Sequence, residues 1–211
     1  MIRMMECFNT ISNGISAEQV IDKSRFIAIV AKVTNTAEVE SHMQEAKLGF
    51  PNARHYVYAY RLFDGKLEKA SDDGEPQGTG GRPILDILQH RQIWDAQIIV
   101  VRYFGGILLG TGGLSRAYGG TARLVLEKAG ITRLVPTFIY RLQIPYSWYE
   151  QIRYGLKQKG WANDKEHFGE NISSNVYIPE KETAMFEVWL DELTNKQVVW
   201  EKREIVMKAG L

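Results

Sequence analysis

Two glycine-rich segments of this sequence hold the residues that could do chemistry. The first runs from Ser71 to Pro83 and reads SDDGEPQGTGGRP, so carboxylates at Asp72, Asp73 and Glu75 are interspersed with glycines. Glycine lets a backbone turn freely and approach a bound group closely. The carboxylates favour a metal ion or a basic partner, whereas N–H groups at a helix start near Pro83 would favour an anion. The alternative is a surface loop with an acidic tip.

The second segment runs from Arg102 to Arg116 and lies between a predicted buried strand and a predicted helix. Phosphate-binding loops occupy this kind of position. The segment is not a Walker loop, because no Gly-Lys-Ser/Thr follows Gly110, and its Gly110-Thr-Gly112 lacks the third glycine of a dinucleotide fingerprint. It distantly resembles the glycine-serine loop of small-molecule kinases with a left-handed βαβ fold.

Local charge adds a second hypothesis for this region. Between Gly78 and Leu126 the only acids are Asp86 and Asp95. The same stretch holds five arginines, with the aromatic residues Tyr103, Phe104 and Tyr118 among them: Arg82, Arg91, Arg102, Arg116 and Arg123. Arginine interleaved with aromatic rings suits the RNA backbone and base stacking. The alternative is that the rings are core residues and the arginines only solvate helix faces.

Established catalytic patterns are missing from the sequence. His42, His55, His90 and His167 have no metal-ligand spacing, and Cys7 has no evident activating base. We therefore predict no metal site. Under an enzyme hypothesis, Asp73 and Glu75 are weak candidates for Mg²⁺ ligands, because alternate residues of an extended segment point to one side.

Composition excludes several protein classes. The chain has 211 residues, 45% hydrophobic and 24% charged, which is typical of a soluble globular protein and not of a disordered or disulfide-rich one. The net charge of +1 gives no whole-chain argument for nucleic acid, so any basic surface must be local. No apolar stretch approaches the roughly 20 residues of a membrane span. We see no signal peptide, and we expect a cytoplasmic protein.

Periodicity predicts the elements that position the two segments. In the first half, strands are expected at 25–33, 56–62 and 96–103, with another ending near residue 70. Helices are expected after Asn35, from Pro83, and over 114–129 with Gly130 as the C-terminal cap. Eleven of the 19 glycines lie between Gly74 and Gly120. Glycine density and charge both change near Pro136, so we predict domains at 1–135 and 136–211.

The second half predicts the element order βαββαβ. A strand over 137–145 is followed by a helix with a capping box at Ser147 and Glu150. Strands at about 161–168 and 174–178, a helix over about 180–193 and a last strand over 197–207 complete the pattern. This is the order of a ferredoxin-like domain, and the chain as a whole is α+β.

The two segments together resemble the YigZ/IMPACT family over about residues 14–130. The motifs are Ser71-Asp-Asp-Gly-Glu-Pro, Gly78-Thr-x-Gly-x-Pro83, Val100-Val-Arg-Tyr-Phe-Gly-Gly106, Leu109-Gly-x-Gly-Gly-Leu114, Arg116-Ala-Tyr-Gly119 and Lys23-Ser-Arg-Phe26, with His55. The resemblance implies an N-terminal left-handed βαβ domain of ribosomal-protein type and an appended ferredoxin-like domain, a pair resembling domains IV and V of elongation factor G. It also implies a link to translational control, since eukaryotic members restrain a stress kinase that phosphorylates an initiation factor.

The motifs and the local charge together give a set of candidate ligand-binding residues. They are Lys23, Arg25, His55, Asp72, Asp73, Glu75, Gly78, Thr79, Gly81, Arg82, Arg102, Tyr103, Phe104, Gly105, Gly106, Gly110, Gly112, Gly113 and Arg116. The sequence departs from the family pattern at Gln77, Gly80 and Leu108. Leu108 stands where the family often has Lys, which removes a candidate phosphate contact.

The leading hypothesis is a non-enzymatic, translation-linked factor that binds RNA, the ribosome or a translation-associated protein. It needs no cofactor. One alternative is an enzyme or binder of a nucleotide or phosphorylated small molecule, with glycine loops on the phosphate and Mg²⁺ on the acidic loop. Another is a protein-binding module that uses the acidic loop. Fold kinship alone does not choose among them, and the oligomeric state stays open.

Overall fold

The computed structural model describes residues 6–210 and divides into two compact units. One comprises Phe8–Thr132, and the other holds the chain from Arg133 onward together with Cys7. Strand β7 (Ile131–Ile144) runs without interruption through this division. Pro136, near which we predicted the domain boundary, therefore lies inside a regular strand and does not interrupt it. Pairing of β7 with β9 (Ile172–Pro179) begins at Thr137, so the missing N–H of Pro136 interrupts no bond of that ladder.

The first unit is built on an antiparallel sheet with the strand order β2-β3-β6-β4-β5. Its strands are β2 (Ile15–Ile21), β3 (Ser24–Lys32), β4 (His55–Leu62), β5 (Leu67–Ser71) and β6 (Ala96–Tyr103). The sequence predicted all of these except β2. It also missed β1 (Phe8–Ile11), which pairs with β7. A tight turn with positive φ at Asp22 and Lys23 joins β2 to β3.

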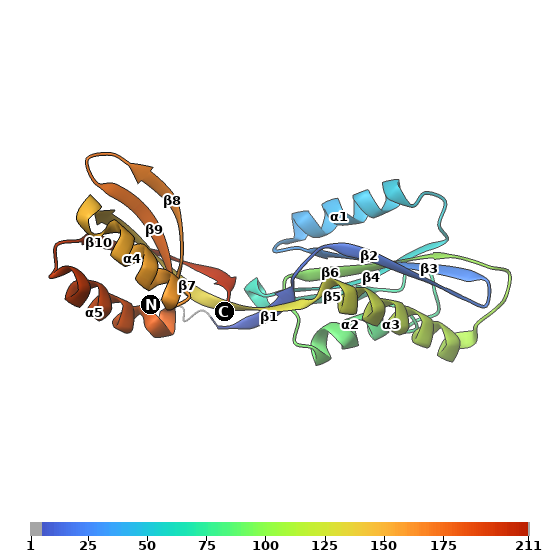
Figure 1. Cartoon of the computed structure of the whole chain (residues 1–211). Coiled ribbons are helices and arrows are strands. Elements are labelled where there is room, and N and C mark those ends of the chain that lie inside the picture. Colours follow the sequence, from blue (N-terminus) through green and yellow to red (C-terminus); the bar gives the residue numbers. More distant parts are fainter. Residues whose placement is uncertain (1–5, 211) are drawn as a thin grey trace. The chain divides into compact units, whose positions relative to one another are not determined.

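Helices cover both faces of this sheet (Figure 1). Helix α1 (Thr36–Gly49) lies on one face, and α2 (Gly81–His90) and α3 (Gly110–Ala129) lie on the other. The main core lies under α2 and α3 and includes Phe26, Leu88, Val100, Tyr118 and Leu126, each fully buried. The predicted N-cap of α1 is confirmed, because Asn35 Oδ1 accepts the N–H of Glu38 at 2.9 Å.

The second unit has the strand order β10-β7-β9-β8 in an antiparallel sheet. Helix α4 (Tyr146–Gln158) links β7 to β8 (Ala162–Phe168), and α5 (Thr183–Thr194) follows a short 3₁₀ turn at Glu180–Glu182 and leads to β10 (Val199–Ala209). The predicted ferredoxin-like order βαββαβ is confirmed. The predicted capping box at Ser147 is wrong, since the N-cap position of α4 is Pro145, two residues earlier, and no side chain caps the helix.

The core of this second unit is rich in aromatic rings. Phe186 makes edge contacts with Tyr140 and Trp161 at centroid distances of 4.8 and 5.2 Å. Across the described part of both units, no helix is long and apolar enough to cross a membrane.

Candidate functional site

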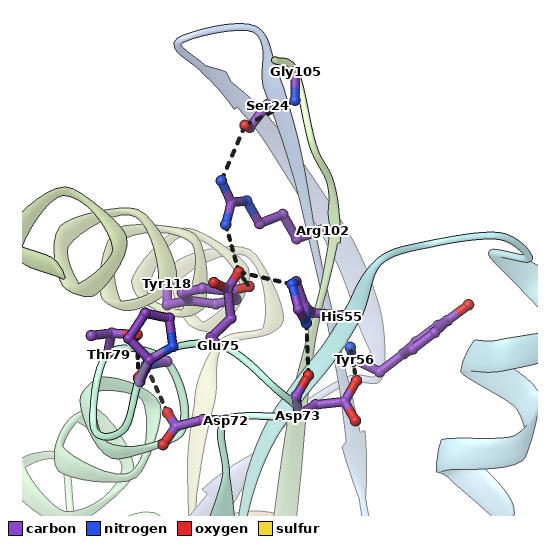
Figure 2. Close-up of polar contacts among 12 residues, drawn as sticks. Ser24, His55, Tyr56, Asp72, Asp73, Glu75, Thr79, Arg102, Gly105 and Tyr118 are labelled. Carbon is purple, nitrogen blue, oxygen red and sulfur yellow. Dashed lines mark hydrogen bonds and ion pairs between the residues drawn. The ribbon is translucent and has the colours of Figure 1, made fainter. Parts of the chain in front are cut away.

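The acidic loop after β5 folds back onto the start of α2 through Asp72 (Figure 2). The Asp72 carboxylate accepts the backbone N–H groups of Gly78, Gly80 and Gly81 at 2.8, 2.9 and 2.8 Å. Partial burial raises the pKa of Asp72, but these hydrogen bonds outweigh the burial and hold that pKa below its ordinary value. The helix start, predicted to favour an external anion, is therefore served by a carboxylate of the chain itself.

The glycines before α2 permit close packing of the backbone. A Cβ atom on Gly81 would lie 2.7 Å from the backbone nitrogen of Ser71, and one on Gly80 would lie 2.7 Å from Val57 Cγ1. Gly78 has a φ of +77°, which favours glycine. Thr79 is buried, and its hydroxyl donates to the Pro76 carbonyl at 2.6 Å. These glycines and Thr79 therefore serve the fold of the loop.

Glu75 is the buried centre of the site (Figure 2). Glu75 is 9% exposed. Its Oε1 accepts hydrogen bonds from Arg102 Nη1 at 2.6 Å and from the Tyr118 hydroxyl at 2.8 Å. His55 Nε2 lies 3.8 Å from the same oxygen. Burial, together with the hydrogen bond to Glu75, raises the pKa of the Tyr118 phenol far above its ordinary value, so Tyr118 stays a donor.

His55 connects Glu75 with Asp73. Its Nδ1 lies 2.7 Å from the Asp73 carbonyl oxygen, which can only accept, so this ring nitrogen carries a proton. The Asp73 carboxylate accepts the backbone N–H of Tyr56 at 2.6 Å. Asp73 and Glu75 thus face different partners, and the structure does not bring their carboxylates together as the Mg²⁺ hypothesis requires. Within the described chain, no group of three or more His, Cys, Asp or Glu side chains could hold a metal ion.

Arg102 ties the acidic loop to the second glycine segment. Its Nη2 donates to Ser24 Oγ at 3.4 Å, and the same oxygen accepts the N–H of Gly105 at 3.2 Å. Arg102 is only 5% exposed, and its Nε has no hydrogen-bond partner. Its prediction as an RNA contact is wrong, because a buried guanidinium paired with Glu75 cannot reach a phosphate at the surface.

The second glycine segment is a shorter loop than predicted. Helix α3 starts at Gly110, so Gly110, Gly112 and Gly113 lie in its first turn and the true loop is Phe104–Leu109. A Cβ on Gly105 would lie 2.0 Å from the Lys23 carbonyl carbon. Gly106 has a φ of +85°. The predicted stacking residue Tyr118 is fully buried and packs edge-on against Phe26, so it cannot meet RNA.

Four cations of the candidate ligand-binding set lie at the surface. Lys23, Arg25, Arg82 and Arg116 are exposed. Arg25 pairs with Glu18 at 2.6 Å, and Arg82 pairs with Asp86 at 2.7 Å. Phe104 is 41% exposed at the loop, and Tyr103 beside it is half-buried, with its hydroxyl donating to the Pro51 carbonyl at 3.0 Å.

Sequence reasoning missed two residues of this site. Ser24 lies inside the Lys23-Ser-Arg-Phe26 motif, so the motif itself was the available signal. Arg54, whose guanidinium carbon lies 5.8 Å from the centroid of the Phe104 ring, immediately precedes β4. Only the pairing of β4 with β6 brings it there, because its N–H donates to the Arg102 carbonyl at 3.0 Å.

Comparisons with known proteins agree with this architecture. Residues 22–126 match the Impact N-terminal domain, and residues 142–197 match a domain of unknown function, DUF1949. A solved structure described as "Crystal structure of an hypothetical protein" shares 30% identity and a TM-score of 0.61, covering 95% of this chain and 99% of its own.

The curated bacterial relatives YvyE and YigZ match over both units. IMPACT family member YvyE of Bacillus subtilis is 37% identical over 193 residues, covering 91% of this chain and 89% of its own length. IMPACT family member YigZ of Escherichia coli is 37% identical over 183 residues, covering 85% and 90%. Protein IMPACT of Mus musculus is 32% identical over 113 residues, covering 50% of this chain and 35% of its own. The resemblance predicted from the motifs is confirmed, and the chain belongs to the IMPACT family.

Proposed function

We propose that this protein acts in the cytoplasm as a non-enzymatic, translation-linked factor that binds RNA or the ribosome. Support comes from how the first unit uses its charges. The groups best suited to catalysis, Glu75, His55 and Arg102, are turned inward and paired with one another. The cations around the Phe104–Leu109 loop are turned outward instead, and this difference carries the proposal.

The outward cations gather around one loop. The backbone of Lys23 lies directly against Gly105, and the Arg54 guanidinium lies beside the Phe104 ring. Arg116 lies in the second turn of α3, close to the glycines that follow the loop. Its Nη1 is the atom that a Cβ on Gly112 would contact. Exposed cations grouped around an exposed ring suit an RNA strand, whose phosphates supply the affinity.

The test is equilibrium binding of the full chain to RNA oligonucleotides and to ribosomes between about 50 and 200 mM salt. We expect the affinity to fall steeply with salt, and Arg116→Ala to reduce the slope of log K against log salt by roughly 1. Lys128→Ala is the matched control, because Lys128 is also exposed but lies in the last turn of α3. Absence of binding to both RNA and ribosomes at about 50 mM salt overturns the proposal.

A further inference from the structure

Three aromatic residues lie near the point where β6 ends and β4 begins, and the ring of each lies beside a cation. Lys47 Nζ lies 5.8 Å from the centroid of the Tyr56 ring. The guanidinium carbons of Arg25 and Arg54 lie 5.9 and 5.8 Å from the Tyr103 and Phe104 rings. Tyr56 and Tyr103 lie on the face of the sheet that packs around Val101, whereas the Phe104 ring lies beside Arg102, which belongs to the other face with Phe26. We call Tyr56, Tyr103 and Phe104 the aromatic end of the sheet.

Two of these rings are fixed in orientation before any ligand binds. The Tyr56 hydroxyl donates to the Phe50 carbonyl at 2.6 Å, and the Tyr103 hydroxyl donates to the Pro51 carbonyl at 3.0 Å. Both carbonyls belong to the short connection between α1 and β4. Rings already held by hydrogen bonds lose little conformational freedom when a partner stacks on them.

Phe104 is the ring that core packing does not explain. Tyr56 and Tyr103 pack against a buried cluster that includes Val101, whereas Phe104 belongs to no core cluster described for the chain. It is 41% exposed, although burying a phenylalanine side chain stabilises a fold. Its position is nonetheless set, because Gly105 locks against Lys23 and Ser24 and because the buried Arg102 guanidinium lies 5.5 Å from its ring centroid.

We propose that the aromatic end of the sheet binds single-stranded RNA, with an unpaired base stacked on Phe104 and with Arg54, which lies beside that ring, serving a flanking phosphate. This inference rests on the proposed function and narrows it. An aromatic face attracts only bases whose own faces are open, and the bases of a duplex are already stacked on one another. The exposed cations beside the rings complement the negative charge of the strand.

The experiment measures binding of the full chain to a 12-nucleotide uridine RNA, the matching DNA and a 12-base-pair RNA duplex. We expect the single-stranded RNA to bind most tightly, and Phe104→Ala to weaken it by about tenfold. Phe104→Trp keeps a stacking ring and should restore the affinity. Leu108→Ala is the matched control, because Leu108 is 88% exposed on the same loop and has no ring to stack. A 2-aminopurine placed in the strand should lose fluorescence when it stacks on Phe104.

The outcomes separate the two proposals. A wild-type chain that binds neither RNA nor ribosomes overturns the proposed function. A chain that binds RNA with the same affinity in wild type and Phe104→Ala overturns the stacking inference alone, and so does equal affinity for the duplex. Equal affinity for the DNA strand overturns the assignment to RNA. Because Phe104 is outside the core, unchanged melting of Phe104→Ala shows that a loss of binding is not a loss of fold.

Discussion

Removing the charge of Glu75 should destabilise the first unit far more than removing a surface charge. In Glu75→Gln the shape of the side chain is kept, but Arg102 loses its ionic partner. The guanidinium, 5% exposed, then retains the long contact with Ser24 Oγ at 3.4 Å and a neutral amide in place of the carboxylate. Breaking a buried ion pair by removing one partner costs about 3–5 kcal/mol, because the other charge stays buried and uncompensated.

A matched control is the exposed pair between Arg82 and Asp86 on α2. Its atoms lie 2.7 Å apart, close to the 2.6 Å of the pair between Arg102 and Glu75, but its side chains are 63% and 38% exposed. Exposed ion pairs contribute about 0.2–1 kcal/mol. Asp86→Asn should therefore cost less than about 1 kcal/mol. The two ion pairs have similar N···O distances but differ in burial. A difference between their effects on the free energy of unfolding therefore reports the effect of burial.

The assay is native-state amide hydrogen exchange of the full chain, read on peptides of β6. Exchange in these buried amides reports the opening free energy of the first unit and not that of the second. The double variant Glu75→Leu with Arg102→Met should recover most of the stability lost in Glu75→Gln, because no buried charge is then left unpaired. The reasoning is refuted if Glu75→Gln costs no more than Asp86→Asn, or if the double variant is less stable than the single one.

Three further perturbations test other contacts. Gly105→Ala should destabilise the first unit by several kcal/mol in thermal melts, because the new Cβ would lie 2.0 Å from backbone. Gly49→Ala, with open space around the new Cβ, should not destabilise the protein, and equal melting of the two variants would contradict this reasoning. Because the folded state lowers the pKa of Asp72, its carboxylate stabilises the fold above the unfolded pKa near 3.8, and this stabilisation is lost as pH falls through the folded pKa. Asp72→Asn should therefore make the free energy of unfolding fall less steeply at acid pH, and an unchanged pH dependence would contradict this expectation. Leu108→Lys should raise the salt slope of RNA binding by about 1, and an unchanged slope would show that the loop tip is away from phosphate.

Local sequence signals predicted most elements because each depends on neighbours along the chain. The apolar run over 96–103 predicted β6 with the bounds that the structure has, and Asn35 predicted the start of α1. Strand β2 was missed because it has no clean alternation of apolar and polar residues: Ile15 and Val20 are exposed, and Ala17 alone of its seven residues is buried. Its place in the sheet comes from pairing with β3, which no local pattern encodes.

The candidate site was predicted as a region but not as an arrangement. The sequence placed Glu75 and Arg102 in two separate segments, but their contact spans 27 residues and depends on the order of β4, β5 and β6 in the sheet. A carboxylate and a guanidinium considered separately suggest a metal ligand and a phosphate contact. In the structure the two groups form a buried ion pair at 2.6 Å. Glu75 is therefore not offered to a metal ion, and Arg102 is not offered to a phosphate.

The glycines show why such segments mislead. A glycine can serve a positive φ, the close approach of another backbone, or the close approach of a ligand, and a sequence does not distinguish among the three. Gly78 and Gly106 serve the first purpose, while Gly81 and Gly105 serve the second. Gly105 fixes the base of the Phe104–Leu109 loop, and Ser24 joins that base to Arg102 and thus to Glu75. The buried charges therefore support the loop from below, and the loop holds the exposed Phe104 ring in place.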